Sequence, residues 1–177
     1  MTVPDSVRVY VPATLAMLQQ LVADGQLFPV SGTAFAVTPT LRESYAEGDD
    51  EELAEVALRE AALGSLRLLA SDHEDAGDAA LPPRRAVLVA DAAADDVKPR
   101  PDLDDAVVRL SAPVTVGALV AVYVDIAAAE SAVRIAMAVI DEADLGDEDA
   151  ELAVGDAQDH DLAWYATQEL PFLLDLL

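Results

Sequence analysis

Arg85-Ala86-Val87-Leu88-Val89-Ala90 is a short, continuous apolar run near the middle of the 177-residue chain. A strand with one solvent-facing side alternates apolar and polar residues, whereas a strand buried on both faces reads as an unbroken apolar run. Pro82 and Pro83 precede the run and disfavour helical backbone there. We therefore expect a central strand over 85–90, in a sheet that helices cover.

Other segments with strand-like composition lie on both sides of this run. The first of them, 7–11, alternates and is rich in β-branched residues, and Pro12 is expected to end it. The polar segment 91–105 is expected to be a loop. The remaining predicted strands are 32–37, 106–110, 118–125 and 161–165.

Helical periodicity predicts the elements between the strands. Thr14 is expected to cap a first helix that ends before Gly25, and Thr40 with Glu43 forms a capping-box pattern for a second. A longer helix is predicted over 50–70, followed by an acidic connector over 71–81. Asp125 is expected to cap a helix with an apolar stripe through Ile140, and Thr167 to cap a short C-terminal helix.

These elements predict one globular domain over 1–177, of α/β or α+β class. The close pair of strands 106–110 and 118–125 favours a mixed sheet over a purely parallel one. We expect about five to six strands packed by three to four helices, and a short apolar segment over 166–177.

The composition limits the classes of function. The chain has 34 Asp and Glu against 10 Lys and Arg, a net charge of −24, and no Cys. Such a field repels phosphate backbones, so direct nucleic-acid binding is not expected, and thiol chemistry is excluded. The longest apolar stretch, 112–124, is shorter than the roughly 20 residues that cross a bilayer, and the N-terminus lacks a signal-peptide pattern. We expect a cytoplasmic protein without a membrane segment.

Acidic and histidine-containing motifs are incomplete as metal or catalytic sites. His73 and His160 each lie between acidic residues, but no helical His-Glu-x-x-His pattern is present. Asp102, with Asp104 and Asp105 beside it, offers carboxylates for magnesium or for acid–base chemistry. The segment 141–152 resembles a calcium loop, yet Ala143 and Leu152 stand where oxygen ligands are needed. The sequence therefore predicts no catalytic set, no metal site and no cofactor.

Aromatic residues near strand ends are the other candidates for function. Tyr10 and Tyr123 each lie near the end of a predicted strand that precedes a helix, where clefts commonly lie, and the alternative is that both are buried core residues. Trp164 and Tyr165 begin an apolar C-terminal region, which either folds back on the core or forms an interface. The residues predicted to form a ligand cleft or an interface are Tyr10, Tyr123, Asp125, His160, Trp164 and Tyr165.

Three segments, 8–14, 32–39 and 159–165, carry a resemblance to known sequences. They read Arg-Val-Tyr-Val-Pro-Ala-Thr, Gly-Thr-Ala-Phe-Ala-Val-Thr-Pro and Asp-His-Asp-Leu-Ala-Trp-Tyr. Together they resemble an uncharacterised family of actinobacterial cytoplasmic proteins. The resemblance implies a bacterial source and a single-domain family, and it transfers no catalytic residue.

The sequence leaves two functional hypotheses open. The first is a non-catalytic interaction or regulatory module that binds a basic protein through its acidic surface, or self-associates through 166–177. The alternative is a small enzyme or ligand-binding domain that uses carboxylates such as Asp102 and Asp125, with His160 and a divalent ion.

Overall fold

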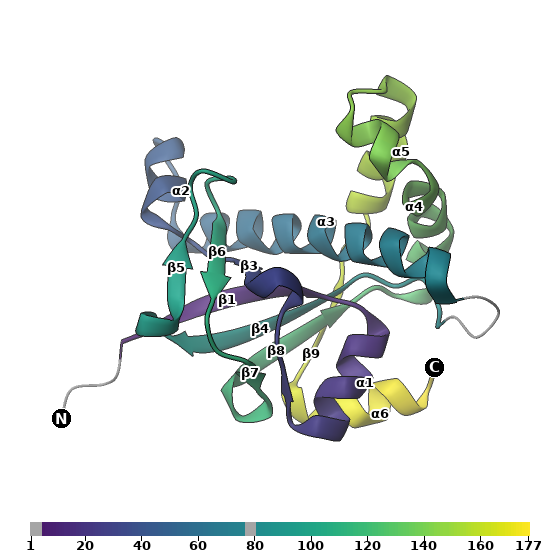
Figure 1. The fold of residues 1–177 in the computed structure, drawn as a ribbon. Helices are drawn as coiled ribbons and strands as arrows, with labels where there is room; N and C mark the ends of the chain where they lie inside the picture. Colours follow the sequence, from purple (N-terminus) through teal and green to yellow (C-terminus); the bar gives the residue numbers. More distant parts are fainter. Residues whose placement is uncertain (1–4, 77–80) are drawn as a thin grey trace.

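The computed structural model describes residues 5–76 and 81–177, with the backbone alone over 73–76. Helices and strands are interspersed along the chain, and short 3₁₀ turns join several of them (Figure 1). No helix of the described ranges is long and apolar enough to cross a membrane. The elements are β1 (Ser6–Ala13), α1 (Leu15–Asp24), β2 (Gln26–Leu27), β3 (Thr33–Phe35), α2 (Pro39–Ser44), α3 (Asp50–Ala76), β4 (Ala86–Ala93), β5 (Val97–Pro99), β6 (Val107–Leu110), β7 (Val114–Thr115), β8 (Leu119–Val124), α4 (Glu130–Asp144), α5 (Glu148–Gln158), β9 (Ala163–Tyr165) and α6 (Leu170–Asp175).

Seven strands form the main sheet, in the order β5-β6-β3-β1-β4-β8-β9. Strand β4 pairs with β1 along its whole length, from Ser6 opposite Ala93 to Ala13 opposite Ala86, and with β8 on its other side. The predicted central strand is therefore confirmed. The two-residue strands β2 and β7 form a separate small sheet.

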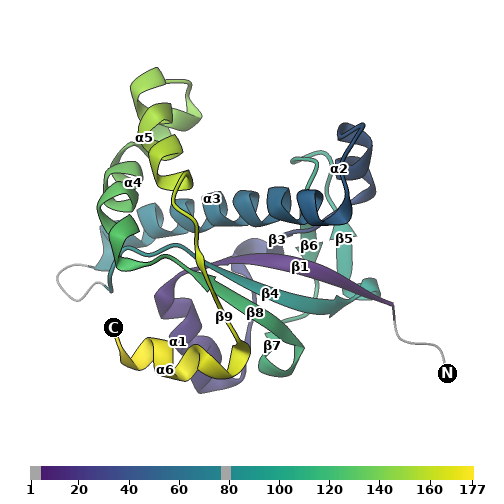
Figure 2. The ribbon, with the colours of Figure 1, turned by 180° about the vertical axis from the view of Figure 1, so that it is seen from behind.

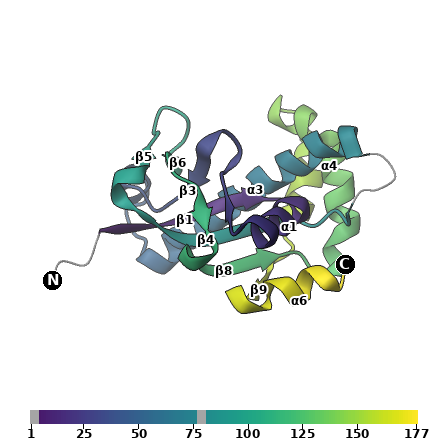
Figure 3. The same cartoon turned by 60° about the horizontal axis from the view of Figure 1, so that its bottom comes forward.

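Helices cover both faces of the main sheet, as the predicted fold class requires. Because side chains alternate between faces along a strand, Val9 and Val11 face α1 and α6, while Tyr10 faces α3. Figures 1 and 2 show α3 along one face and α1 with α6 across the other, and Figure 3 shows α1 and α6 from their own side. Helices α4 and α5 pack on the second half of α3 through a smaller core around Leu66 and Ile140.

The strand predictions are confirmed in position and corrected in extent. Strand β1 continues through Pro12. Its pairing with β3 is described by one register pair, Tyr10 with Phe35, and Pro12 lies beyond that pair. The missing N–H of Pro12 is therefore tolerated. The segment 91–105 is not a loop throughout, since β4 runs to Ala93 and β5 follows. Every pair of neighbouring strands in the described sheets is antiparallel, and the main sheet has seven strands, so the expected mixed sheet of five to six strands is corrected to a larger antiparallel one.

Two of the predicted helix caps are confirmed. Thr14 accepts a hydrogen bond from the Met17 N–H, and Gly25 ends α1 in the left-handed conformation (φ 77°). The second helix instead begins after Thr38, whose hydroxyl accepts from the Leu41 N–H, so the predicted capping box at Thr40 is wrong. Pro39 follows Thr38 directly, and proline is favoured at the first helical position.

The later helices depart further from the prediction. Helix α3 extends to Ala76, so the first six residues of the connector predicted over 71–81 are helical. Helix α5 was predicted as no element at all, because its acidic surface leaves little apolar periodicity. The predicted caps Asp125 and Thr167 are both wrong, since the Asp125 side chain is engaged elsewhere and the Thr167 hydroxyl donates to the Leu119 carbonyl at 3.4 Å.

Close contact between α3 and β1 depends on Gly64. A Cβ atom at this position would lie 2.9 Å from Pro12 Cγ and 3.2 Å from Pro12 Cβ. To relieve these close contacts, α3 would have to move away from the sheet. We expect Gly64→Ala to lower the free energy of unfolding by about 1–3 kcal/mol, measured by urea denaturation. Gly155→Ala is the matched control, because nothing lies within 4 Å of its Cβ position, and it is expected to stabilise by up to about 1 kcal/mol. Equal stabilisation by both substitutions would contradict this account of the contact.

Candidate functional site

The most deeply buried ion pair in the described structure joins the residue before β4 to the residue after β8. The Arg85 side chain is 1% exposed and the Asp125 side chain is not exposed at all. Arg85 Nε donates to Asp125 Oδ2 at 2.8 Å, and Nη2 donates to Oδ1 at 2.7 Å. The pair is bidentate, which is the strongest geometry for a guanidinium and a carboxylate.

Local backbone structure positions both partners. Arg85 immediately precedes β4 and Asp125 immediately follows β8, at the same end of two paired antiparallel strands. The Asp125 N–H donates to the Arg85 carbonyl at 3.0 Å, and the Arg85 N–H donates to Asp125 Oδ2 at 2.8 Å. The ladder between the strands therefore brings the two side chains into register.

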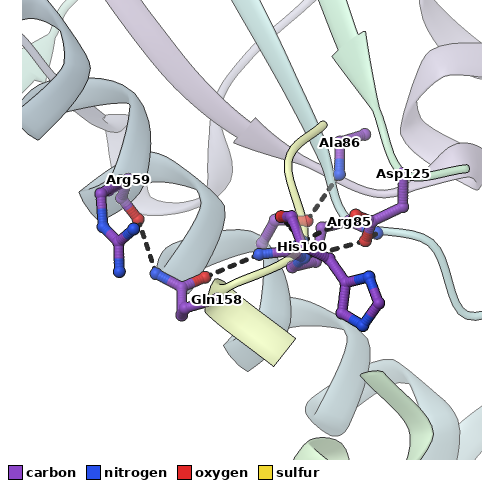
Figure 4. A network of polar contacts seen from close by, with 7 residues as sticks. Arg59, Arg85, Ala86, Asp125, Gln158 and His160 are labelled. Atoms are coloured by element: carbon purple, nitrogen blue, oxygen red, sulfur yellow. Dashed lines mark hydrogen bonds and ion pairs between the residues drawn. The ribbon is translucent and has the colours of Figure 1, made fainter. Parts of the chain in front are cut away.

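The same guanidinium also binds the chain segment that leads from α5 to β9 (Figure 4). Arg85 Nη1 donates to Gln158 Oε1 at 2.8 Å, and Nη2 donates to the His160 carbonyl at 2.7 Å. The Gln158 amide donates in turn to the Arg59 carbonyl of α3 at 3.1 Å. Beside this network, the Ser65 hydroxyl donates to the Ala13 carbonyl and accepts from the Ala86 N–H. Arg85 thus connects the ends of both strands to the end of α5, and Gln158 extends the network to α3.

This geometry assigns Asp125 a structural task. Its two oxygens accept three hydrogen bonds from Arg85, and no surface of the side chain reaches solvent. A general base or a metal ligand needs a lone pair directed at a substrate or an ion. The arrangement can anchor chain segments to each other, and because the carboxylate is fully buried it presents no lone pair to solvent.

Breaking the pair is expected to destabilise the fold severely. Asp125→Asn leaves the Arg85 charge buried without a counterion, which typically costs about 3–5 kcal/mol, measured as the free energy of unfolding in urea. The exposed pair of Arg8 with Asp91 provides the control, because Asp91→Asn is expected to cost less than about 1 kcal/mol. A similarly small loss of unfolding free energy in both variants would show that another group compensates the charge of Arg85.

The predicted cleft residues lie at different depths. Tyr10 is buried under α3, and Tyr123 is half-buried on the same face of the sheet. Trp164 is opposite Tyr123 in the β8–β9 register and is 57% exposed, whereas Tyr165 faces the other side, toward the core of α1 and α6. Figure 4 shows the His160 imidazole directed away from the Arg85 network that its carbonyl joins. Tyr123 and Trp164 are therefore neighbours, and Tyr165 is not part of the same surface.

The carboxylates predicted to work with His160 are separated. Asp102 follows β5 and pairs with Arg100 at 2.8 Å, while Asp125 lies beyond β8, and four strands lie between β5 and β8 in the sheet order. The His73 side chain lies outside the described part of the chain. In the calcium-like segment, Asp147 instead caps α5 by accepting from the Ala150 N–H. No group of three metal-ligating side chains occurs among the residues that the structure describes.

Burial raises the pKa of two groups on the α3 side of the sheet. Desolvation raises the pKa of Tyr10, with a smaller contribution from nearby Tyr123 in the same direction. Desolvation also raises the pKa of Glu60 on α3, and Asp104 adds to this effect while Arg67 opposes it. Perturbed groups often mark functional sites, but Glu60 and Tyr10 are not brought together with His160 or Asp125.

Glu60 gives a pH-dependent prediction. Because its folded-state pKa is raised, its ionised form destabilises the fold, and stability falls as the pH rises from the unfolded pKa through the folded pKa. Glu60→Gln is therefore expected to raise the free energy of unfolding at pH 7, and this gain is expected to disappear below both pKa values. Urea unfolding at a series of pH values measures it, and a gain that is independent of pH would contradict the assignment.

A cavity of about 510 Å³ lies between the second half of α3 and α4. Its apolar side includes Met137 and Ile140, and its polar rim includes the ion pair of Arg67 with Asp144 at 2.9 Å. None of the six residues predicted from the sequence lines it. The lining residues are Arg67, Ala70, Ser71, Arg134, Met137, Ala138, Ile140, Asp141 and Asp144.

The segment from the end of α4 to the start of β9 is a strongly acidic surface, which we call the acidic lobe (residues 141–161). It contains ten Asp and Glu and no Lys or Arg, and all ten acidic residues are exposed. Leu145 and Leu152 are also exposed within it, at 89% and 68%. Figure 2 shows α5 projecting beyond the sheet. The acidic run was visible in the sequence, whereas its helical conformation was not.

Comparison with known proteins identifies a family that the chain matches. The chain is similar over residues 7–174 to a family of unknown function, DUF6912. No curated protein and no solved structure matches it.

Proposed function

Since the chain belongs to the DUF6912 family, which has no assigned function, we propose a function from the structure of the chain. We propose that it is an interaction module whose acidic lobe binds a basic protein. The observation that carries this proposal is the exposure of all ten acidic side chains of the acidic lobe. A concentrated negative potential speeds the approach of a positively charged surface and selects against acidic partners.

Ion pairs within the molecule leave most of this charge uncompensated. Of the six ion pairs that the structure describes, one involves the acidic lobe, through Asp144 and Arg67. Asp147 and the acidic residues of the first turn of α5 also stabilise the helix itself. The acidic residues near the ends of α4 and α5, such as Glu142, Asp156 and Asp159, lie where the helix dipole is unfavourable to them. Their positions therefore favour a role in recognition over a role in folding.

The exposed leucines define the partner more closely. Leu145 and Leu152 are apolar side chains within a charged surface, and an apolar contact surrounded by ion pairs is the usual anatomy of an interface. A basic segment with apolar anchors complements this arrangement. The proposed partner is therefore a basic, amphipathic region of another protein, in line with the first hypothesis from the sequence.

Neutralising charges that do not support the fold tests this proposal. Wild-type protein is used to capture partners from host lysate, and the proteins released at rising salt are identified by mass spectrometry. The variant Glu142→Gln/Asp156→Asn/Asp159→Asn is expected to retain its stability and to lose those partners. The control Glu43→Gln/Glu47→Gln/Glu55→Gln makes the same change of net charge at exposed residues outside the lobe. Equal loss in both variants, or no salt-released basic protein, would contradict the proposal.

Helix α6 supports a second candidate, self-association through the C-terminal segment. Leu170 and Leu173 are buried against the core, whereas Phe172 and Leu176 are 72% and 86% exposed. These two residues are four apart, a spacing that places side chains on the same side of a helix. The segment thus packs on its own domain by one side and leaves an apolar side exposed.

Analytical ultracentrifugation tests this second candidate. If α6 mediates self-association, wild-type protein is expected to form dimers at micromolar concentration, and Phe172→Ser/Leu176→Ser is expected to shift the equilibrium to monomers by removing apolar contact area. Ile135→Ser serves as the control, because Ile135 is an exposed apolar residue on α4. A monomeric wild-type protein would overturn the candidate without affecting the proposal for the acidic lobe.

A further inference from the structure

The few basic residues of this acidic chain differ in whether they form ion pairs in the described structure. Of its ten Lys and Arg, six form ion pairs in the described structure, and the other four are Arg59, Lys98, Arg109 and Arg134. Two of these four, Lys98 and Arg109, are direct partners in the β5–β6 register. Like charges placed opposite each other across two strands repel and destabilise the pair. Their juxtaposition therefore calls for a physical explanation.

A row of donor side chains crosses this edge of the sheet. Thr33 of β3 is opposite Arg109 of β6, which is opposite Lys98 of β5. Strand alternation places all three side chains on the face that carries α3, since Phe35 and Val107, two residues away, belong to the core under that helix. The row contains an ammonium, a guanidinium and a hydroxyl group.

The Arg109 side chain is held in place by a hydrogen bond, but one of its donors has no acceptor among the described residues. Its Nη1 donates to the Ser31 carbonyl at 3.0 Å, and Ser31 adopts a left-handed backbone conformation (φ 56°). Its Nε is excluded from solvent and has no hydrogen-bond acceptor among the described residues. Buried donors without an acceptor are rare in folded proteins. The row thus contains one fixed guanidinium, whose buried Nε has no acceptor among the described residues, beside a second positive charge.

We propose that Lys98, Arg109 and Thr33 form a binding site for the phosphate group of a small molecule. An oxyanion with several oxygens accepts from the ammonium, the guanidinium and the hydroxyl together, and it removes the repulsion between the two cations. In the loop after β5, the pKa of Asp102 is lowered chiefly by its hydrogen bond from Arg100, with which it forms an ion pair at 2.8 Å, and less by the charge of Arg109. This site lies at the opposite end of the sheet from α5, so it is independent of the acidic lobe (Figure 1).

Titration of the ¹⁵N-labelled chain with inorganic phosphate tests the site, with ionic strength held constant by chloride. We expect saturable shifts of the Thr33, Lys98 and Arg109 amide signals, and weakening by about 10-fold or more in Lys98→Met, which corresponds to about 1.4 kcal/mol of binding free energy. Lys98 is exposed at the sheet edge, so this variant is expected to fold even if Arg109→Met does not. Arg59→Met is the control, because it removes one exposed positive charge from α3.

Two further ligands define the chemistry of the site. Glycerol phosphate, an ester, is expected to shift the same amide signals, whereas binding of inorganic phosphate alone would restrict the ligand to the free anion. Acetate, with two oxygens, is expected to bind at least about 10-fold more weakly than phosphate. The proposal is overturned if the phosphate shifts do not saturate, if acetate binds equally well, or if Arg59→Met weakens binding as much as Lys98→Met. In that event Lys98 only protects an exposed strand edge from pairing with other chains.

Discussion

The buried ion pair of Arg85 with Asp125 is the constraint around which the chain is arranged. A guanidinium with 1% exposure must have its charge and its donors satisfied inside the protein, and here a carboxylate, an amide oxygen and a backbone carbonyl do so. These acceptors come from β8, from the end of α5 and from the segment before β9. Satisfying one side chain therefore fixes where three distant parts of the sequence meet, and it holds the acidic lobe against the sheet.

The two faces of the sheet meet different requirements. One face packs against α1 and α6 through side chains such as Val9 and Val11, and the other approaches α3 closely enough that Gly64 has no room for a side chain. The edge strands β5 and β9 are only partly buried. At the β5 edge, polar side chains on the α3 face are available to bind a ligand, and at the β9 edge Trp164 is largely exposed. Function in such a domain is decided by local sites, because the sheet and its helices do not themselves imply an activity.

Charge is distributed so that the two proposed sites are complementary in sign and separate in space. The acidic lobe concentrates ten exposed acidic residues beside two exposed leucines, whereas the β5–β6 edge places two cations side by side. A basic protein and a phosphate group would therefore bind at different ends of the molecule. Their binding can be measured independently, since no residue of one site belongs to the other.

Sequence patterns by themselves determined the apolar central strand at 85–90, the cap at Thr14, the glycine that ends α1, the α/β class and the acidity of 141–161, because each depends on neighbours within a few residues. Only the tertiary structure decided that Asp125 is the counterion of Arg85, forty positions away, that α5 is helical, and that Lys98 faces Arg109. Strand register and the satisfaction of a buried charge are set by contacts between distant segments. Local propensity and periodicity carry no information about those contacts.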